Sequence, residues 1–483
     1  MVALKKLFKK GPMVGMLYWA KFGGWWRPMF KSSRFIGLWV ALIVFLVHPS
    51  VVSQAQSTPL YIVYINDQAG LSLIALSSEG WSAPQPFVAA IDLPVYALHA
   101  SPDGQKIAVI YAQPYANGSP VVLKVFSVPD AALLFEQNLL PANLPIFTEP
   151  DLGNPSYEMA RAVTTAAWSP NGQRLAFVSG QDDISANVYL VDFATNPTPT
   201  LLENYAGAAA FLSWSPDGNW LTYSDLETFG GAGYVSQGIY AIHTADGQTL
   251  TLDNGTLYPN DVTRVGWRGT DTLLFSPPSY TAGARGLYGW NLSDGTTTAY
   301  LPETSENTLP VYDPVSDIAA FAVPSQAISL VFEPGIYVMA LASNTPVQLT
   351  TGDWYDVRLV GSPYFQAVGG MGEILINGQT YQQNSLPVGE LGTFVTPNLS
   401  GAVAYFNDGI QLSSLDGNNP AKLPIEGALP PTWSPDGQWF ITYGFTSSGA
   451  GLLSVDVSTQ VATLLDTSAA IGGLWTLAFD TTP

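Results

Sequence analysis

The amino-acid sequence predicts an all-β fold in which a four-stranded unit repeats around a ring. Three observations support this prediction. A short turn motif, Trp-Ser-Pro-Asp-Gly in its full form, recurs along the chain. Runs that alternate apolar and polar residues follow most copies, and no segment shows the sustained 3.6-residue periodicity of a helix. The 483 residues also include 45 Gly and 37 Pro, which suits many short strands joined by tight turns.

The first element, residues 1–55, has the features of an export signal. Eight of the 17 Lys and Arg residues precede residue 35, and an apolar run of 13 follows at 35–47. Ser53 and Ala55 then stand at the −3 and −1 positions of a small-x-small cleavage site. The run is shorter than the ~20 residues of a membrane-spanning helix. We therefore expect a cleaved signal peptide with an extended basic n-region, and an uncleaved anchor is the alternative.

The repeats fill the rest of the chain, residues 56–483. Close copies of the motif begin at Leu98, Ala166, Leu212 and Pro431, and eroded copies begin at Val265, Pro310 and Phe394. In the motif, Pro presets φ, the Asp side chain caps the turn, and Gly takes a positive φ. Each copy therefore reads as a tight turn between two strands. An Ile-Tyr-x-x-Asp run and an Asp-Gly turn then predict a third and a fourth strand.

Four-stranded repeats of about 40–50 residues are typical of β-propeller blades. With this motif, the repeats resemble those of the TolB-like (PD40, WD40-like) β-propeller family over residues 60–480, nearly the whole mature chain. The resemblance implies a single β-propeller domain and points to a bacterial source. It implies no particular activity.

The number of blades and the closure of the ring follow from the two ends of the repeat region. The chain enters it with three strand-like runs, starting at Tyr61, that lack an innermost strand, and it leaves with an extra run at 474–480. We expect that last run to pair into the N-terminal blade and close the ring. One shared blade and seven motifs predict eight blades, with seven as the alternative. A weak unit at Leu359 would make nine, but we expect 352–388 to be an insertion or an eroded blade.

Composition restricts the chemistry. The absence of Cys excludes disulfides, thiolate metal sites and Cys nucleophiles. After residue 55 the chain has 9 basic and 37 acidic residues, a formal charge of −28, which argues against a nucleic-acid partner. His99 and His243 are the histidines left after cleavage, and their spacing suggests structural roles. The sequence has no Gly-x-Ser-x-Gly or His-Glu-x-x-His motif. We expect no cofactor, and Asp182 with Asp183 is the one calcium candidate.

The candidate binding residues lie in the long loops. Loops between second and third strands, and between blades, share one face of a propeller and vary in length here, and variable loops on a rigid scaffold tend to carry function. The predicted binding residues are Phe147, Glu149 and Tyr157 in 139–161, Glu227 and Tyr234 in 224–237, Tyr280 and Arg285 in 276–286, and Phe332 and Glu333 in 323–334.

Together these features predict an exported, non-catalytic propeller that binds or scaffolds proteins in the periplasm, in the cell envelope or outside the cell. A protein is the expected partner and a glycan the second choice, with membrane contact only through an uncleaved N-terminal segment. Two alternatives stay open. One is a secreted enzyme that acts on glycans or other extracellular polymers through carboxylates at the propeller funnel. The other is a structural subunit of a membrane-attached complex.

Overall fold

The computed structural model of the chain falls into two compact units, Met1–Ser57 and Thr58–Pro483, and all the residues described below belong to the second. The described residues are 60–112, 120–140, 165–180, 186–203, 208–228, 234–252, 263–276, 286–301, 308–325, 332–370, 372–386, 393–395, 402–406, 409–414, 420–434, 436–470 and 473–479.

These residues form nine antiparallel sheets and contain no helix. Each sheet is a blade, numbered here in chain order. Blade 1 consists of β1 (Leu60–Ile65), β2 (Leu71–Ser77), β3 (Gly80–Trp81), β4 (Gln85–Val88) and β38 (Trp475–Ala478). Blade 2 consists of β5 (Val95–Ala100), β6 (Lys106–Tyr111), β7 (Val122–Ser127) and β8 (Leu133–Asn138). Blade 3 consists of β9 (Ala166–Trp168), β10 (Arg174–Ser179), β11 (Asn187–Asp192) and β12 (Thr200–Glu203).

The next three blades keep the same strand order. Blade 4 consists of β13 (Ala208–Trp214), β14 (Trp220–Thr228), β15 (Tyr234–His243) and β16 (Thr249–Thr251). Blade 5 consists of β17 (Thr263–Arg268), β18 (Thr272–Ser276), β19 (Leu287–Asn291) and β20 (Thr297–Leu301). Blade 6 consists of β21 (Val311–Asp313), β22 (Ile318–Val323), β23 (Gly335–Ala340) and β24 (Val347–Thr351).

The last three blades bring the chain back to blade 1. Blade 7 consists of β25 (Trp354–Gly361), β26 (Tyr364–Gly369), β27 (Gly372–Asn377) and β28 (Gln383–Leu386). Blade 8 consists of β29 (Thr393–Val395), β30 (Ala402–Phe406), β31 (Ile410–Ser414) and β32 (Ala421–Lys422). Blade 9 consists of β33 (Glu426–Ala428), β34 (Thr432–Trp433), β35 (Trp439–Thr446), β36 (Gly449–Asp456) and β37 (Val461–Asp466).

The predicted all-β propeller is confirmed, but the predicted count of eight blades is wrong, because the described residues form nine. The additional blade is blade 7, in the segment expected to be an insertion or an eroded blade. Its first turn lacks the Trp and the Gly of the motif, which hid it in the sequence. Its strands nevertheless keep a buried face, with Val357, Phe365 and Ala367 in one apolar cluster with residues of blade 6.

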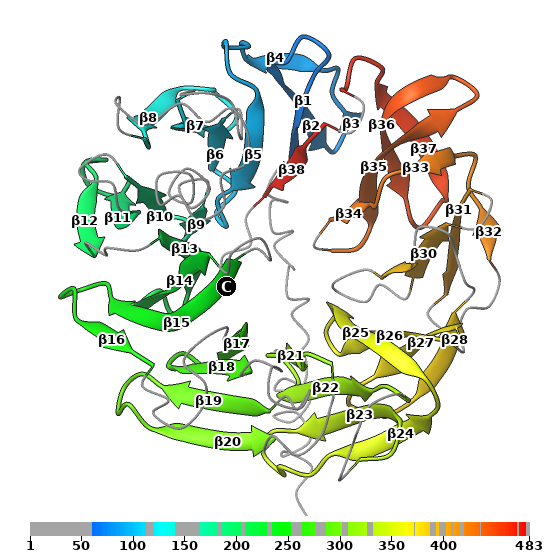
Figure 1. The fold of residues 1–483 in the computed structure, drawn as a ribbon. Helices are drawn as coiled ribbons and strands as arrows, with labels where there is room; N and C mark the ends of the chain where they lie inside the picture. The colour runs from blue at the N-terminus through cyan, green and yellow to red at the C-terminus, as the bar shows by residue number, and fades with distance from the viewer. Residues whose placement is uncertain are drawn as a thin grey trace, which may run out of the picture. The chain divides into compact units, whose positions relative to one another are not determined.

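The last strand closes the ring, as expected. β38 pairs antiparallel with β1, with Tyr61 opposite Ala478 and Tyr64 opposite Trp475. Apolar clusters then join blade 9 to blade 1 and blade 1 to blade 2, and contacts between neighbours continue around the ring. Figure 1 shows the blades following one another in a circle, with β38 beside β1.

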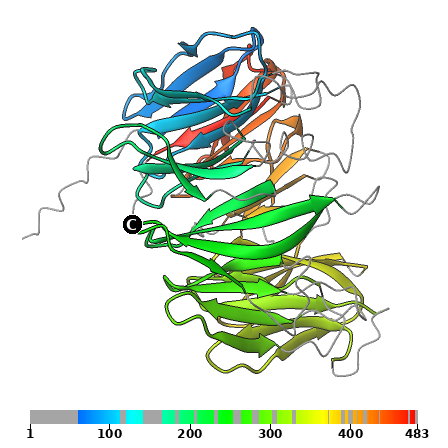
Figure 2. The ribbon, with the colours of Figure 1, turned by 60° about the vertical axis from the view of Figure 1, so that its left-hand side comes forward.

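The core lies between the faces of neighbouring blades. All six residues of β6 and of β22 are buried, because the second strand of a blade is covered on both faces. The outermost strands are largely exposed, as in β8 and β20. Figure 2, turned by 60°, shows the sheets stacked face against face. This packing explains why the sequences of the second strands are nearly continuous apolar runs.

The repeated motif forms the turn between the first and second strands, as predicted. In the blade 2 copy, the Ser101 hydroxyl accepts a hydrogen bond from the backbone N–H of Lys106, and the Asp103 carboxylate accepts one from that of Gln105. The same two bonds recur in the copies of blades 4 and 9, and in blade 3 the amide oxygen of Asn171 replaces the carboxylate. The turn glycines have φ between 64° and 72°. The motif is therefore a structural turn on the face opposite the long loops.

Candidate functional site

A polar layer at the motif turns links blades 2, 3 and 4. The Trp168 Nε1–H donates to the backbone oxygen of His99, one blade back, and the Trp214 Nε1–H donates to that of Ala167, both at 2.9 Å. Each indole also lies under a cation from the preceding blade. Lys106 Nζ is 5.9 Å from the Trp168 ring centroid, and the Arg174 guanidinium is 4.9 Å from that of Trp214. The recurring tryptophans therefore hold neighbouring blades together.

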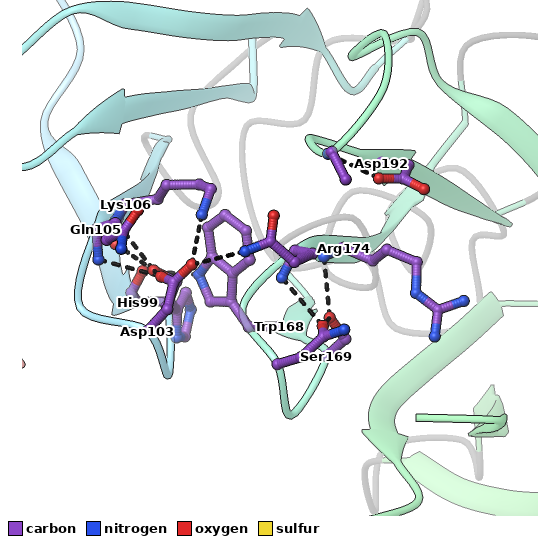
Figure 3. A network of polar contacts seen from close by, with 12 residues as sticks. His99, Asp103, Gln105, Lys106, Trp168, Ser169, Arg174 and Asp192 are labelled. Carbon is purple, nitrogen blue, oxygen red and sulfur yellow. Dashed lines mark hydrogen bonds and ion pairs between the residues drawn. The ribbon is translucent and has the colours of Figure 1, made fainter. Parts of the chain in front are cut away.

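Asp103 is the centre of this layer, as Figure 3 shows. Its carboxylate accepts hydrogen bonds from Lys106 Nζ at 2.7 Å, from Gln173 Nε2 of blade 3 at 3.2 Å, and from the Ser101 hydroxyl. Asp103 and Lys106 are both buried. Burial also lowers the pKa of the nearby His99 imidazole below its usual 6.5, which favours the neutral ring. The polar groups of this layer bond to one another, and we assign the layer a structural role.

The second candidate histidine lies on an exposed turn. His243 ends β15, and its Nδ1 is 2.8 Å from Asp246 Oδ1. The hydrogen bond from His243 holds the pKa of the Asp246 carboxyl below its usual value. Asp246 also accepts from the backbone N–H of Gln248, which caps the turn to β16. This pair stabilises the turn between β15 and β16, consistent with the structural role expected from the sequence.

The described part of the chain contains no group of three or more His, Cys, Asp or Glu side chains that could hold a metal ion. The calcium candidates Asp182 and Asp183 lie in 181–185, outside the residues that the structure describes. Among the described residues, no helix has the length and apolar character needed to cross a membrane.

The structure places four of the nine predicted binding residues, and the other five, Phe147, Glu149, Tyr157, Tyr280 and Arg285, lie in ranges that are not described. Glu227 and Tyr234 lie at the far end of the β14–β15 hairpin, where Glu227 pairs with Val235 and Thr228 with Tyr234.

Phe332 and Glu333 lie together just before β23. The Phe332 ring is 5.1 Å from the Tyr337 ring and 5.8 Å from the Phe321 ring, and the Tyr337 hydroxyl donates to the Glu333 backbone oxygen at 2.8 Å. These contacts anchor the segment to the core of blade 6.

Sequence reasoning missed a set of exposed apolar side chains at one repeat position. In motif blades, the recurring Trp pairs with the second residue of the next strand, as Trp168 does with Leu175. The residues with this pairing in blades 1, 2, 7 and 9 are Ala478, Ala100, Leu359 and Trp433. Four positions earlier along the chain stand Leu474, Tyr96, Tyr355 and Leu429, all exposed. Tyr96 and Tyr355 lie in β5 and β25, Leu474 directly precedes β38, and Leu429 lies between β33 and β34. Aligning the repeats on their second strands would have revealed this pattern.

All four side chains lie at the end of the innermost strands opposite the motif turns. The Leu474 backbone oxygen accepts from Ile65, the last residue of β1, and Tyr96 follows Val95, which pairs with the last residue of β6. Phe445 near the end of β35 is exposed at the same end of blade 9. We call these five residues the apolar rim: Tyr96, Tyr355, Leu429, Phe445 and Leu474. Each has 37–57% of its residue surface exposed.

Exposed carboxylates flank the apolar rim. Asp92 precedes β5, Asp353 directly precedes β25, and Glu426 pairs with Phe445. Hydrogen bonds from the hydroxyl and the backbone N–H of Ser325 hold the pKa of Asp353 below its usual value. Asp353 is therefore ionised at neutral pH, and this end of the ring combines apolar surface with negative charge.

No family model matches the chain, and no curated protein matches it by sequence. Among solved structures, the chain is similar to a eukaryotic initiation factor, with a TM-score of 0.54 and 13% identity over 87% of this chain and 98% of that one. It is also similar to dipeptidyl peptidase 4 from Porphyromonas gingivalis, with a TM-score of 0.47 and 14% identity over 77% and 60%. A third similar structure is an oligogalacturonate lyase in complex with manganese, with a TM-score of 0.36 and 14% identity over 75% and 98%. At this identity the similarity to the initiation factor shows a likeness of fold alone, and membership of the TolB-like family stays a prediction.

Proposed function

We propose that the chain is an exported, non-catalytic β-propeller that binds a protein partner at the apolar rim. One observation carries the proposal: exposed Tyr and Leu side chains recur at the same repeat position in four blades. A group of exposed apolar side chains with a polar border is typical of protein-interaction sites. Blades 9, 1 and 2 are neighbours, so Leu429, Leu474 and Tyr96 follow one another along the ring.

The charge of the propeller favours a partner segment that is both apolar and basic. Residues 56–483 carry a formal charge of −28, and carboxylates flank the apolar rim. Several basic side chains are already paired internally, as in the ion pairs of Lys106 with Asp103 and Arg268 with Asp317. The surface field therefore stays negative, which attracts basic segments and accelerates their association at low salt.

Binding experiments with matched variants test the proposal. Tagged residues 56–483 are used to capture partners from envelope and secreted fractions, and the captured protein's affinity is then measured with purified components. We expect Tyr96→Ser with Leu474→Ser to weaken that affinity by about 1–3 kcal/mol, because buried apolar contacts are lost. Leu133→Ser is the control, since Leu133 is 52% exposed on the outermost strand of blade 2.

Equal affinity of the rim variant and the control would contradict binding at the apolar rim. Capture of no partner, together with activity in glycan-hydrolase or lyase screens, would favour the secreted-enzyme alternative. Export is tested separately by N-terminal sequencing of the mature protein, which we expect to begin at Gln56.

A further inference from the structure

The innermost strands of blades 2, 7 and 9 each contain a β-bulge at the end where the apolar rim lies. In β5 the bulged residue is Tyr96, which lies between two residues paired with β6. In β25 it is Tyr355, between two residues paired with β26. A bulge leaves the extra residue unpaired and re-aims its side chain. The two tyrosines are exposed for this reason, although their neighbours are paired.

In blade 9 the bulged residue is a glycine, and the aromatic ring comes from the neighbouring strand. Gly427 has a φ of 62° and interrupts the pairing of β33 with β35, between Glu426 and Ala428. A Cβ on Gly427 would lie 3.5 Å from Cδ2 of Phe445, so the Phe445 ring lies beside the glycine. Phe445 is exposed like the two tyrosines. Each of the three bulges therefore has one exposed aromatic ring.

In blades 7 and 9 an exposed carboxylate accompanies the ring. Glu426 pairs with Phe445 across the strands, and opposite residues of an antiparallel pair have Cβ atoms about 5 Å apart. Asp353 lies two residues before Tyr355, and Trp354 between them is buried. Because side chains alternate along an extended chain, Asp353 and Tyr355 lie on the same, exposed side. Both blades thus combine a ring and a carboxylate on the apolar rim.

Neither carboxylate has a cationic partner among the residues that the structure describes. The ion pairs there involve other carboxylates: Asp103, Glu136, Asp246, Asp317 and Asp356. Asp353 accepts hydrogen bonds from the hydroxyl and the backbone N–H of Ser325, at 2.7 and 3.1 Å. Both bonds end on Oδ1, and in the described part of the chain Oδ2 accepts none. Asp353 is thus fixed in place with one oxygen left for a donor.

Elsewhere the chain itself shows how an aromatic ring and a carboxylate hold a cation. The Arg268 guanidinium lies 5.1 Å from the Tyr300 ring centroid and donates to both oxygens of Asp317, at 2.8 and 2.9 Å. A planar guanidinium can stack on a ring while its N–H fork bonds a carboxylate, and the compact ammonium of lysine cannot do both in this way. The rim offers the same two groups in blades 7 and 9.

We propose that two subsites on the apolar rim hold arginine side chains of the partner segment. The subsites are Tyr355 with Asp353, and Phe445 with Glu426. They rest on the proposed function, and they specify arginine as a side chain that the rim recognises. The formal charge of −28 on residues 56–483 attracts any cationic segment, whereas a ring beside a carboxylate favours arginine over lysine.

The binding of two synthetic peptides to the mature protein, followed by fluorescence anisotropy, tests the proposal. Each peptide has three cationic side chains separated by glycines, all arginine in one and all lysine in the other, so the long-range attraction is the same. We expect wild type to bind the arginine peptide about threefold or more tightly. Tyr355→Leu with Phe445→Leu keeps the apolar surface but removes the rings, and should abolish this preference. Tyr381→Leu, in an exposed turn at the other end of blade 7, should leave it unchanged.

The carboxylates are tested in the same way. Glu426→Gln with Asp353→Asn should reduce the preference for arginine, because the guanidinium fork loses its acceptors. Glu79→Gln is the control, since Glu79 is exposed in the turn between β2 and β3, at the end of blade 1 opposite the rim. It should leave the preference unchanged.

Equal affinity for the two peptides in wild type, binding of neither, or an unchanged preference in the double leucine variant would overturn the arginine subsites. If that variant does not fold, each single leucine variant is judged by the same criterion. Failure here is distinct from failure of the proposed function. A captured partner that binds Tyr96→Ser with Leu474→Ser more weakly, together with peptides that show no preference, would keep the apolar rim as the binding site and remove only its arginine subsites.

Discussion

At the scale of single residues, the same motif position has different roles in different blades. Asp103 and Asp217 both cap their turns through the backbone N–H two residues later. Asp103 is buried and pairs with Lys106, whereas Asp217 is exposed and its other partners are the polar groups of Ser215 and Asn219. The local turn needs only a side-chain oxygen, and the buried cation makes the carboxylate necessary in blade 2.

Substituting the two aspartates should therefore have unequal effects. Asp103→Asn leaves Lys106 buried without a counter-ion, and we expect a loss of about 3 kcal/mol in the free energy of unfolding. Asp217→Asn keeps the turn oxygen, and we expect a loss of about 1 kcal/mol or less. Denaturant unfolding of the two variants measures the difference. Equal losses would show that the ion pair adds nothing to the turn.

His99 should make stability depend on pH. Its folded pKa is lowered by burial, so below pH 6.5 the unfolded chain takes up a proton that the folded chain does not. This contribution is present above the unfolded pKa and is lost as the pH falls through 6.5 towards the lower folded pKa. We expect His99→Gln to lose less stability than wild type between about pH 7.5 and about pH 5.5. Thermal unfolding across this range provides the measurement, and parallel curves would contradict the prediction.

At the scale of elements, the motif turn is also a packing unit between blades. A Cβ on Gly172 would lie 2.6 Å from Asp103 Cγ, and a Cβ on Gly104 would lie 2.4 Å from the backbone carbonyl carbon of Phe479. Each turn therefore fits against the preceding blade with no room for a side chain. The glycine serves both the positive φ of its own turn and the approach of its neighbour.

A matched pair of glycine substitutions separates these two effects. Gly172 and Gly247 have similar φ values, 67° and 74°, but a Cβ on Gly247 would meet nothing within 4 Å. We expect Gly247→Ala to cost about 1 kcal/mol, from backbone strain alone. Gly172→Ala should cost roughly 2 kcal/mol more, because blades 2 and 3 must move apart. Similar melting temperatures for the two variants would mean that the interface between blades 2 and 3 accommodates the added Cβ at no measurable cost in stability.

At the scale of the whole molecule, stability depends on the strand that joins the two ends of the ring. β38 completes blade 1, and Leu477 is buried in the cluster shared by blades 9 and 1. We expect Leu477→Asp to lower the midpoint of thermal unfolding of the entire propeller, with a cost of roughly 3 kcal/mol or more. Leu474→Asp on the exposed rim is the control. A separate early transition confined to blade 1, seen by hydrogen exchange, would contradict cooperative closure.

The sequence predicted the fold well because the motif encodes a local turn whose Pro, Asp and Gly act within a few residues. Blade 7 was expected to be an insertion or an eroded blade because its turn keeps the Ser and Pro of the motif but lacks the Trp, Asp and Gly, while its buried face, from Val357 to Phe365, persisted. The apolar rim was missed for a different reason. Whether Tyr96 or Tyr355 is exposed depends on strand register and on which end of the ring the strand reaches. The composition of the loops instead predicted Phe332 as a binding residue, and its ring packs against the core of blade 6.

The pairing of β1 with β38 has a consequence for the order in which the chain is made. A ribosome produces β1 before every other described strand and β38 after all of them. Until β38 emerges, blade 1 has an unpaired edge along Tyr61 to Tyr64, and the apolar cluster between blades 9 and 1 is incomplete. The ring therefore cannot close before β38 has emerged from the ribosome. A chain truncated before β38 would expose that edge permanently, which would make it prone to aggregation.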